Sequence, residues 1–441
     1  MAEVRAFRGI RYNPEKNPKL GDVMAPPYDV IDDDRRAALA GVSDKNVVRL
    51  ILPRQDEVSG AADKYAAAAE ILKDWSSQEV VAQDSAPAFY RYRQDFTLSG
   101  SDEIHSREGL IAAVRLHEFS EGIILPHEKT LSGPKADRLA LIEATKTNLS
   151  PTFSFYFDPA GNVASAMGEA PADAWCDFTD DENVRHRLWA ISDEAQVAAI
   201  TKAFADLKLY LADGHHRYTT ALHYREKIRE QNGKTDPEHP AEFMMMFVAD
   251  AAQMTVLPYN RMLLASAGVD GRKHAPEMIR ALHEYFEDET HVTKDEAGQQ
   301  AFLDALLAAD APYALGIVGP GHAHLLTSKD AAAVEALFDQ SVPGPVRALD
   351  VAVLHSLILE KQFALTTDKI AEGGKLSYTP DAMKVFGWVN SDKAELGFLL
   401  RPTKLEEVRD VAEAGEVMPQ KSTYFYPKLL SGLVFRSVAG E

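Results

Sequence analysis

Five residues of chemically active types stand in a row in this sequence: Asp213, Gly214, His215, His216 and Arg217. The apolar run 207–212 predicts a buried strand, Asp-Gly predicts a turn, and the amphipathic pattern through 218–228 predicts a helix. A helix N-terminus offers unpaired N–H groups and positive dipole charge, so it favours phosphate or carboxylate. Gly214 permits close approach and Arg217 can grip two oxygens, while the histidines can exchange protons near neutral pH. The plainer alternative is an Asp-Gly turn before an exposed helix.

A second polar stretch, residues 125–138, leads into an expected helix over 136–146 and holds His127, Glu128, Lys129, Lys135 and Arg138. We expect a lid or clamp whose three basic side chains meet phosphate oxygens while His127 or Glu128 handles a proton. The small polar residues 148–152, which precede an expected strand over 153–157, are candidates for lining the same pocket. A loop that carries charges of both signs can also simply be solvated.

Two further polar stretches lie near the ends of the chain. Adjacent prolines at 26 and 27 hold the backbone extended and present Tyr28 and Asp29 in a fixed orientation. Near the other end, residues 414–428 offer Lys421, Ser422 and Thr423, followed by aromatic residues that could stack on a base. We expect this tail to return to the main site. The alternatives are an ordinary turn and a tail packed by its aromatic rings.

Composition limits the classes of partner. The chain has 441 residues, 46% of them hydrophobic and 26% charged, as in a globular protein. A formal net charge of −20 argues against nucleic acid and anionic membranes as partners, because both attract basic surfaces. The lone cysteine, Cys176, fits a reducing cytoplasm, and no apolar run approaches the ~20 residues of a membrane span. We expect a cytoplasmic protein, either a monomer or a homo-oligomer.

The order of expected elements indicates a mixed α/β (α+β) fold. Strands over 47–52 and 187–191 are followed by helices over 61–75 and 193–205. After residue 261 the character changes, and a long helix is expected over 347–360. We therefore divide the chain into 1–265, the expected catalytic domain, and 266–441, an α/β region of helices and strands whose tail returns to the site.

Four motifs together carry a resemblance to a known family: residues 25–31, 127–130, 212–218 and 418–427. They resemble a large bacterial and archaeal family catalogued as domain of unknown function 1015, across nearly the whole chain. The Asp-Gly-His-His-Arg motif at a strand-to-helix junction also looks like the phosphate-binding turn of the ParB/sulfiredoxin superfamily. One branch of that superfamily comprises free-serine kinases, which phosphorylate L-serine using ADP or ATP and have a similar motif. The resemblance implies a ParB/sulfiredoxin-like core and a nucleotide as ligand.

The leading hypothesis is a nucleotide-dependent phosphotransferase that acts on a small hydroxylated metabolite, with serine or phosphoserine favoured. The residues expected to bind phosphate are Gly214, His215, His216, Arg217, Lys129, Lys135, Arg138, Lys421, Ser422 and Thr423. Glu128 or Asp29 would deprotonate the attacking hydroxyl, and Asp213 would hold Mg²⁺. Three alternatives stay open at this point: a phosphatase on the same substrate, a nucleotide-binding regulator of the ParB type, and a metal hydrolase that uses His127, His215 and His216.

Overall fold

The computed structural model describes residues 1–128, 133–233 and 235–439, and for Gly133 and Pro134 it describes the backbone alone. The expected phosphate ligand Lys129 lies outside the described residues. The chain forms two compact units, each taken by itself below. The first comprises residues 1–126, 130–255 and 427–441, and the second comprises 127–129 and 256–426.

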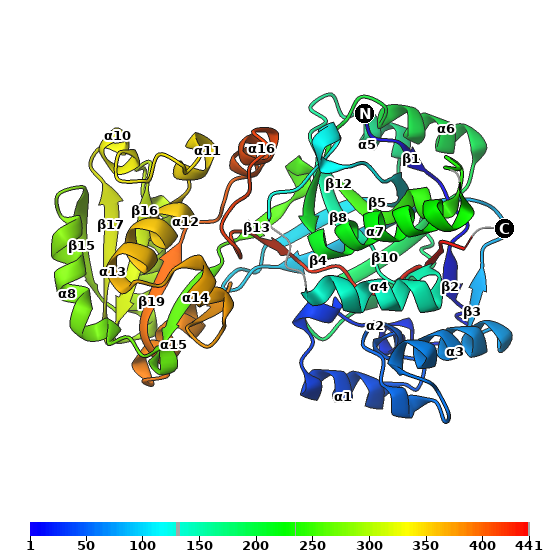
Figure 1. Ribbon diagram of the computed structural model, residues 1–441, viewed down its shortest axis with the longest axis horizontal. Coiled ribbons are helices and arrows are strands. Elements are labelled where there is room, and N and C mark those ends of the chain that lie inside the picture. Colours follow the sequence, from blue (N-terminus) through cyan, green and yellow to red (C-terminus); the bar gives the residue numbers. More distant parts are fainter. Residues whose placement is uncertain (129–132, 234, 440–441) are drawn as a thin grey trace. The chain divides into compact units, whose positions relative to one another are not determined.

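Within the described residues, the first unit is built on a mixed nine-stranded sheet (Figure 1). Its main path runs β6-β11-β8-β12-β5-β4-β10-β9, and β1 pairs with β5. β11 is parallel to β6 and antiparallel to β8, while β12 is parallel to β8 and antiparallel to β5. The strands are β1 (Val4–Arg5), β4 (Phe89–Thr97), β5 (Ile104–Arg115), β6 (Ile124–Leu125), β8 (Thr152–Tyr156), β9 (Cys176–Thr179), β10 (Arg185–Ile191), β11 (Leu209–Asp213) and β12 (Phe243–Asp250).

Two small strand pairs stand beside this sheet in the first unit. They are β2 (Ile10–Tyr12) with β3 (Val81–Gln83), and β7 (Thr147–Asn148) with β21 (Arg436–Ser437). The α-helices are α1 (Asp33–Val42), α2 (Val48–Ile51), α3 (Lys64–Ser77), α4 (Gly133–Thr145), α5 (Asn162–Met167), α6 (Glu194–Ala203) and α7 (His215–Asn232). Short 3₁₀ turns are η1 (Leu20–Val23), η2 (Tyr28–Val30), η3 (Gln55–Glu57), η4 (Phe119–Glu121), η5 (Pro240–Glu242) and η6 (Ala251–Gln253).

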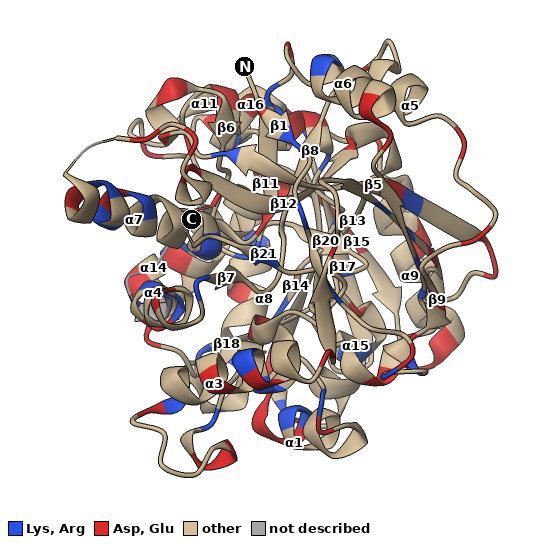
Figure 2. Ribbon diagram, turned by 90° about the vertical axis from the view of Figure 1, so that its right-hand side faces the viewer, with Lys and Arg blue, Asp and Glu red and all other residues tan. Residues whose placement is uncertain are grey.

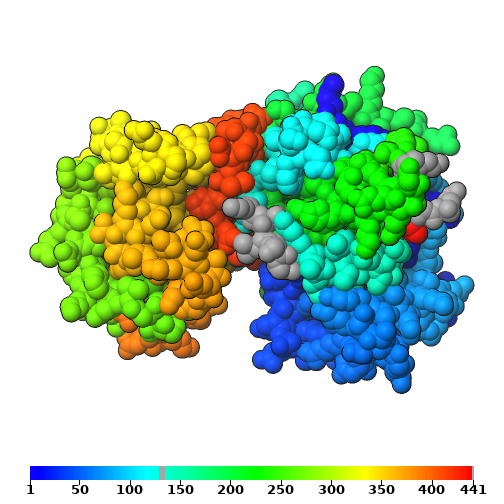
Figure 3. All heavy atoms as spheres, in the orientation of Figure 1, coloured from blue at the N-terminus to red at the C-terminus, as the bar shows by residue number. Residues whose placement is uncertain are grey.

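The main core of this unit lies between one face of the sheet and helices α5, α6 and α7. Met244, Met246 and Val248 alternate along β12 and bury their side chains against α7 residues such as Leu222, as the strand period of two requires. α4 runs alongside α7, and the two helices meet through Ile142 and Tyr224 (Figures 1 and 3). Acidic and basic residues both occur along α7 (Figure 2).

The second unit is built on a six-stranded antiparallel sheet with the order β15-β17-β16-β19-β14-β18. Its strands are β14 (Asn260–Leu264), β15 (Phe286–Val292), β16 (Ala314–Gly319), β17 (His322–Ser328), β18 (Leu376–Thr379) and β19 (Ala394–Leu400). β13 (Thr255–Leu257), which carries the chain into this unit, pairs with β20 (Tyr424–Tyr426). The core includes Phe302, Phe386 and Leu399, all of which are buried.

Helices of the second unit are α8 (Gly271–Leu282), α9 (Glu296–Ala308), α10 (Ala331–Glu335), α11 (Gly344–Arg347), α12 (Asp350–Ala352), α13 (Lys361–Phe363), α14 (Thr367–Ala371), α15 (Ala382–Asn390) and α16 (Leu405–Glu413). A 3₁₀ turn, η7 (Ala265–Ala267), follows β14. The helix expected over 347–360 is divided: α11 ends at Arg347, α12 begins at Asp350, and a π-helix, η8 (Val353–Glu360), follows.

The mixed α+β class is confirmed, but the strand expected over 47–52 is wrong. Val48–Ile51 forms the short helix α2, in which Val48, Leu50 and Ile51 are all buried. A short run of apolar residues is compatible with a buried strand or a buried helix, because its periodicity does not distinguish them. The Oδ1 atom of Asn46 accepts the backbone N–H of Val48 at 2.9 Å and helps to begin the turn.

The two units divide at residues 255 and 256, earlier than the boundary at 265 drawn from the sequence. The last residues, 427–441, belong to the first unit, where β21 pairs with β7. Residues 429–438 supply buried apolar side chains to it, among them Leu433, Val434 and Phe435. The C-terminal segment is therefore a part of the unit that contains α7.

Candidate functional site

The turn between β11 and α7 is the centre of the candidate site. Asp213, the last residue of β11, pairs with Phe153 of β8, so the end of β11 lies beside the beginning of β8. Gly214 is the N-cap of α7, with φ of +90°, and the eighteen-residue helix begins at His215. The first N–H groups of such a helix have no partner within it, so they face outward at this turn.

Gly214 is required by its conformation and by its surroundings. A residue with φ near +90° is strained unless it is glycine. A Cβ atom on Gly214 would lie 2.8 Å from Cγ2 of Thr152 and 3.0 Å from Nη2 of Arg217. The missing side chain thus leaves space that the arginine and the start of β8 occupy.

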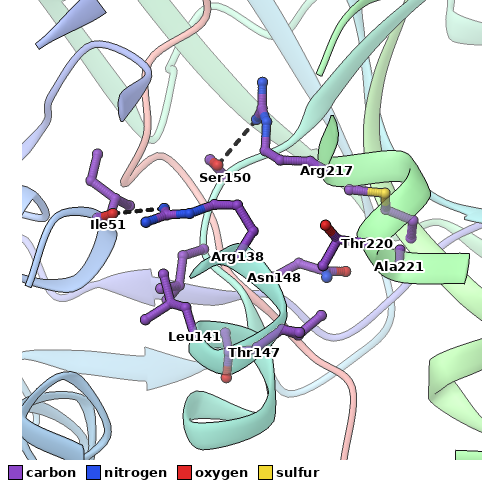
Figure 4. Close-up of a pocket in the computed structure, with 12 residues that line it drawn as sticks. Ile51, Arg138, Leu141, Thr147, Asn148, Ser150, Arg217, Thr220 and Ala221 are labelled. Carbon is purple, nitrogen blue, oxygen red and sulfur yellow. Dashed lines mark hydrogen bonds between the residues drawn. The ribbon is translucent and has the colours of Figure 1, made fainter. Parts of the chain in front are cut away.

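Arg217, in the first turn of α7, reaches across to the segment before β8. Its Nη1 donates to Oγ of Ser150 at 3.1 Å (Figure 4) and also to the carbonyl oxygen of Pro151. Nε and Nη2 find no acceptor among the residues that the structure describes. The guanidinium is therefore held by one nitrogen and keeps two others for an anionic ligand.

Asp213 is paired with a lysine from the C-terminal segment. Nζ of Lys428 donates to Oδ2 of Asp213 at 3.0 Å. Burial alone would raise the pKa of Asp213, but Lys428, Arg217 and His215 outweigh it and hold this pKa well below the usual range. Asp213 is consequently an ionised structural partner of the cations around it.

Tyr28 brings the N-terminal motif into the same neighbourhood. The guanidinium carbon of Arg138, from α4, lies 4.3 Å from the centre of the Tyr28 ring. Burial raises the pKa of Tyr28, while the charges of Arg217 and Arg138 oppose the rise. Tyr28 therefore stays protonated at neutral pH and can donate through its hydroxyl. Asp29, the next residue, is exposed.

A small pocket of about 60 Å³ opens between α4, α7 and the segment before β8 (Figure 4). Arg217 and Arg138 both line it, and in this view they come from different helices, with Ser150 beside Arg217 and Ile51 beside Arg138. Nη1 of Arg138 donates to the carbonyl oxygen of Ile51 at 2.7 Å, and its other end binds Asp137. The remaining lining residues are Leu141, Ile142, Thr147, Asn148, Leu149, Thr220, Ala221 and Met244.

A second, water-sized cavity of about 10 Å³ also borders Arg217. It is lined by Pro27, Ser150, Pro151, Phe153, Asp213, Arg217, Leu429 and Ser431. Oγ of Ser431 is fully buried and has no hydrogen-bond partner among the described residues. A buried hydroxyl without a partner costs free energy, and such groups concentrate where a ligand or an ordered water completes the structure.

The two histidines of the motif differ in exposure. His215 is buried and His216 is half-buried. Their backbone carbonyl oxygens accept from the hydroxyls of Thr219 and Thr220 at 3.0 and 2.8 Å. His216 is thus the more exposed of the two at the helix start, whereas His215 lies on the buried side, where its charge helps to lower the pKa of Asp213.

The remaining predicted site residues fall in two places. Lys135 lies in the first turn of α4, one turn before Arg138 in the first unit. His127, Glu128, Lys421, Ser422 and Thr423 belong to the second unit. There Nε2 of His127 lies 2.9 Å from Oγ1 of Thr423, and Oε1 of Glu128 accepts the backbone N–H of Lys421 at 3.2 Å.

The second-unit group is further organised around a buried arginine. Arg261 is fully buried, and its Nη2 donates to the carbonyl oxygens of Lys421 at 2.9 Å and Gln420 at 3.3 Å. Lys421 has φ of +59°, a left-handed conformation. These contacts fix the backbone of residues 420–421, and through it the segment that carries the predicted hydroxyls of Ser422 and Thr423.

Mg²⁺ at Asp213 does not fit this arrangement. A magnesium site needs carboxylates and other oxygen ligands, whereas Asp213 is bound to Lys428 and lies close to the charges of Arg217 and His215. Within the described parts of the chain, no group of three or more His, Cys, Asp or Glu side chains is placed to hold a metal ion. The hydrolase alternative, with His127, His215 and His216 on one metal, lacks such a group.

Two contacts in this neighbourhood were not expected from the sequence. Residues 148–152 were expected to line the pocket, and Asn148 and Ser150 do so. The pairing of Lys428 with Asp213 and the buried Ser431 were not anticipated. The sequence does show a lysine, Lys428, directly after an aromatic run and a proline. Its partner Asp213 lies 215 residues away in sequence, so the pairing could not be predicted from this local pattern.

The family model described as "Protein of unknown function (DUF1015)" matches residues 4–352. No curated protein matches the chain. Among the residues that the structure describes, no helix combines the length and the apolar character needed to cross a membrane.

Several solved structures show a distant likeness. A mutant free serine kinase in complex with ADP is 11% identical, with a TM-score of 0.33, 69% of this chain covered and 84% of that chain. A free serine kinase in complex with AMP is 12% identical, with a TM-score of 0.31 and the same coverage. C-terminally truncated SbnI from Staphylococcus aureus is 12% identical, with a TM-score of 0.34 and coverage of 73% and 85%. Likeness at these scores carries no weight for function.

Proposed function

The chain belongs to the DUF1015 family of proteins of unknown function, and we propose that it transfers a phosphoryl group from a nucleotide to a small hydroxylated metabolite. L-Serine is the first acceptor to test, with phosphoserine as the product. The observation that carries the proposal is the β11–α7 turn. There a glycine with φ of +90°, the start of an eighteen-residue helix and the open nitrogens of Arg217 meet.

The turn suits a phosphate because its donors are already in place. N–H groups at the start of α7 and the positive end of the helix dipole would face the phosphate oxygens. Arg217 would bind two of these oxygens through its planar guanidinium. Gly214 keeps this surface open, because a Cβ there would reach the Arg217 guanidinium.

The pocket shown in Figure 4 is our candidate for the acceptor. Its volume of about 60 Å³ suits a metabolite of a few heavy atoms and excludes a nucleoside. Oδ1 of Asn148 already accepts the backbone N–H of Met245 at 3.0 Å, so its amide nitrogen is the end that can donate to a ligand. Arg217 and Arg138 line the pocket, and because the charge of Arg138 is paired with Asp137, Arg217 is the cation that would favour a carboxylate there.

The transfer step balances with the two substrates and one base on the protein. The acceptor hydroxyl oxygen bonds to the terminal phosphorus, and the bond from that phosphorus to the bridging oxygen breaks. The nucleotide leaves with one phosphate fewer, and the hydroxyl proton passes to a base. Asp29 is our candidate base in the first unit, because it is exposed and adjoins Tyr28. His127 and Glu128 remain predicted proton carriers, and Lys135, Arg138, Lys421, Ser422 and Thr423 remain predicted phosphate ligands.

In this proposal Asp213 and Lys428 are positioning residues at the β11–α7 turn. The ionised Asp213 holds the ammonium group of Lys428 at the turn and limits the positive charge there. No step is assigned to a metal at Asp213, because its cationic surroundings do not suit one.

The test is to incubate the purified protein with L-serine and ATP or ADP and to measure phosphoserine. Arg217→Ala should lower the rate about 100-fold, the typical effect of losing one donor to the transferred group. Lys227→Ala is the matched control, because it removes a cation from the far part of the same helix, where Lys227 pairs with Glu143. Lack of phosphoserine with either nucleotide, or a rate that Arg217→Ala leaves unchanged, would contradict the proposal. Release of inorganic phosphate from phosphoserine without nucleotide would identify a phosphatase instead.

A further inference from the structure

The second unit contains a larger pocket, which the proposed phosphotransfer does not use. It has a volume of about 650 Å³ and lies between α8 and the face of the sheet formed by β16, β17 and β19. Its walls are mainly apolar, with Ile279, Ile317 and Leu396 among them, and two histidines of β17, His322 and His324, line it as well. Two imidazoles in a mostly apolar pocket call for a chemical explanation.

The strand geometry places the two imidazoles together. His322 and His324 are two residues apart on β17, so their side chains project from the same face of the sheet. Their ring centres are 5.4 Å apart, and the ring planes meet at 83°. The rings are thus neighbours with edges that can face a common point.

Hydrogen bonds determine which nitrogen of each ring carries its proton. Nδ1 of His322 lies 2.9 Å from the carbonyl oxygen of Pro320, and Nδ1 of His324 lies 2.9 Å from a carboxylate oxygen of Asp288. A carbonyl oxygen and an ionised carboxylate only accept, so both Nδ1 atoms must donate. In the neutral imidazoles, Nε2 is therefore the atom with the lone pair in both rings.

We propose that His322 and His324 bind a divalent transition-metal ion, such as Zn²⁺ or Ni²⁺, through their two Nε2 atoms. Imidazole is a preferred ligand of these ions. Two imidazoles on one tetrahedral Zn²⁺, with Zn–N bonds of about 2.0–2.1 Å, have ring centres about 5 Å apart, close to the observed separation. Metal-bound histidines usually donate their other N–H to a carboxylate or a backbone carbonyl, and these two histidines have one partner of each kind.

Gly319 supports the placement of His322. A Cβ atom on Gly319 would lie 3.0 Å from both Cε1 and Nε2 of the His322 ring. The ring therefore packs directly over a residue without a side chain, with its coordinating edge in the space that a larger residue would take. The Gly319-Pro320-Gly321-His322 loop is too short a signal for a phosphate loop. The packing of the His322 ring explains why its first residue is a glycine.

The site is an open one. The described residues supply no third His, Cys, Asp or Glu to form a closed cluster, so the remaining coordination positions face the pocket. Open positions are typical of metals that bind water or a ligand, as opposed to purely structural metals. The exposed Arg280 at the pocket and the walls around Ile317 favour a ligand with an anionic donor group and an apolar body.

The experiment is a calorimetric titration of the untagged, full-length protein with ZnCl₂ and, separately, NiSO₄. We expect one saturable equivalent in the wild type, lost or weakened at least about 10-fold in His322→Ala and in His324→Ala. Asp288→Asn should weaken binding about 10- to 100-fold, the usual effect of removing a carboxylate behind a histidine ligand. His223→Ala, which removes an exposed histidine of α7, should leave the titration unchanged.

Two results would overturn the proposal: no saturable equivalent of either ion in the wild type, or an equivalent that persists in both single variants. Circular dichroism melting of each variant without metal distinguishes a lost ligand from a lost fold. His322 is exposed and His324 is half-buried, so both substitutions should leave the fold intact. Gly319→Ala is an independent test that keeps both histidines. Its added methyl group should crowd the His322 ring and weaken metal binding.

Discussion

Gly214 is the residue on which the candidate turn depends most directly. The sequence alone allows the turn to be predicted, since Asp-Gly between an apolar run and an amphipathic run is a local signal. It does not allow the partners of that turn to be predicted. Thr152 and Lys428 reach it from distant parts of the chain, and their contacts depend on strand order and on the path of the C-terminal segment.

Gly214→Ala should destabilise the protein by about 1–3 kcal/mol, because a side chain at φ of +90° is strained and its Cβ would overlap Thr152. Urea unfolding followed by circular dichroism measures the change. Gly41→Ala is the control. Gly41 lies in α1 with open space around its Cα, so alanine there should be neutral or add up to about 1 kcal/mol. Equal stability of the two variants would show that the strain at Gly214 has been overestimated.

Asp213 should make the stability depend on pH in the acid range. Its pKa is lower in the folded protein than in the unfolded chain, where it is about 4. The stabilisation is therefore fully present above pH 4 and is lost as the pH falls below 4. Asp213→Asn should be less stable than the wild type at pH 7. The difference between their free energies of unfolding should become smaller between pH 4 and pH 2. A gap that stays constant in urea unfolding across that range would contradict the ion pair with Lys428.

At the scale of elements, the sequence predicted most of the strands and helices that carry the site. β11, α7, α4 and β8 were all expected, with ends that differ by a few residues. The failures have physical causes. Residues 47–52 form the helix α2 because a short apolar run does not fix its own conformation. The helix over 347–360 is interrupted by a π-helix, and its pattern of apolar residues gave no sign of the change in hydrogen bonding.

That π-helix carries a second pH-dependent feature. Burial, together with the charge of Arg261, lowers the pKa of His355 to about 3. His355 is thus neutral in the folded protein, whereas it takes up a proton below about pH 6.5 once unfolded. The second unit should lose stability as the pH falls from 6.5 towards 3, by about 1.4 kcal/mol for each unit of pKa difference. His355→Gln should flatten this dependence in thermal unfolding scans, and an unchanged slope would contradict the neutral buried histidine.

A buried polar network holds the segment that delivers Lys428. Gln94 donates to the carbonyl oxygen of Lys428 at 3.0 Å, and Arg107, fully buried, donates to the carbonyl oxygen of Pro427. Gln94→Leu should leave that backbone carbonyl unsatisfied and cost about 1–3 kcal/mol. It should also speed hydrogen exchange at residues 427–431. Exchange that is unchanged at these residues would show that the segment is held by its apolar contacts alone.

At the scale of the whole molecule, the boundary between the units was the hardest feature to predict. A boundary near 265 follows a change in composition, but the first unit takes its last residues from the C-terminus, beyond the whole second unit. The polar tail 414–428 was expected to return to the main site, but no local pattern marks residues 427–441 as a part of the first unit. A single chain that leaves a unit and comes back to it can be recognised only when the partners of residues 427–438 are known, such as the pairing of β21 with β7.

Removing residues 427–441 should therefore unfold the first unit while the second keeps its own sheet. The deletion takes away six buried apolar side chains: Leu429, Leu430, Leu433, Val434, Phe435 and Val438. At about 1.5–3 kcal/mol each, their loss is comparable to the 5–15 kcal/mol by which a typical domain is stable. Limited proteolysis should cleave within residues 1–250 and spare 260–400. A deletion variant that resists cleavage in both parts would contradict this dependence.

Phosphate binding at the β11–α7 turn can be measured by calorimetric titration of the protein with ADP, ATP and phosphoserine. We predict saturable binding of at least one of these ligands to the wild type. Binding should be weakened at least about 10-fold by Arg217→Ala, in keeping with the loss of a charged donor worth about 1.5–3 kcal/mol, and unchanged by Lys227→Ala. Lack of binding by all three ligands, or binding that Arg217→Ala leaves intact, would contradict it.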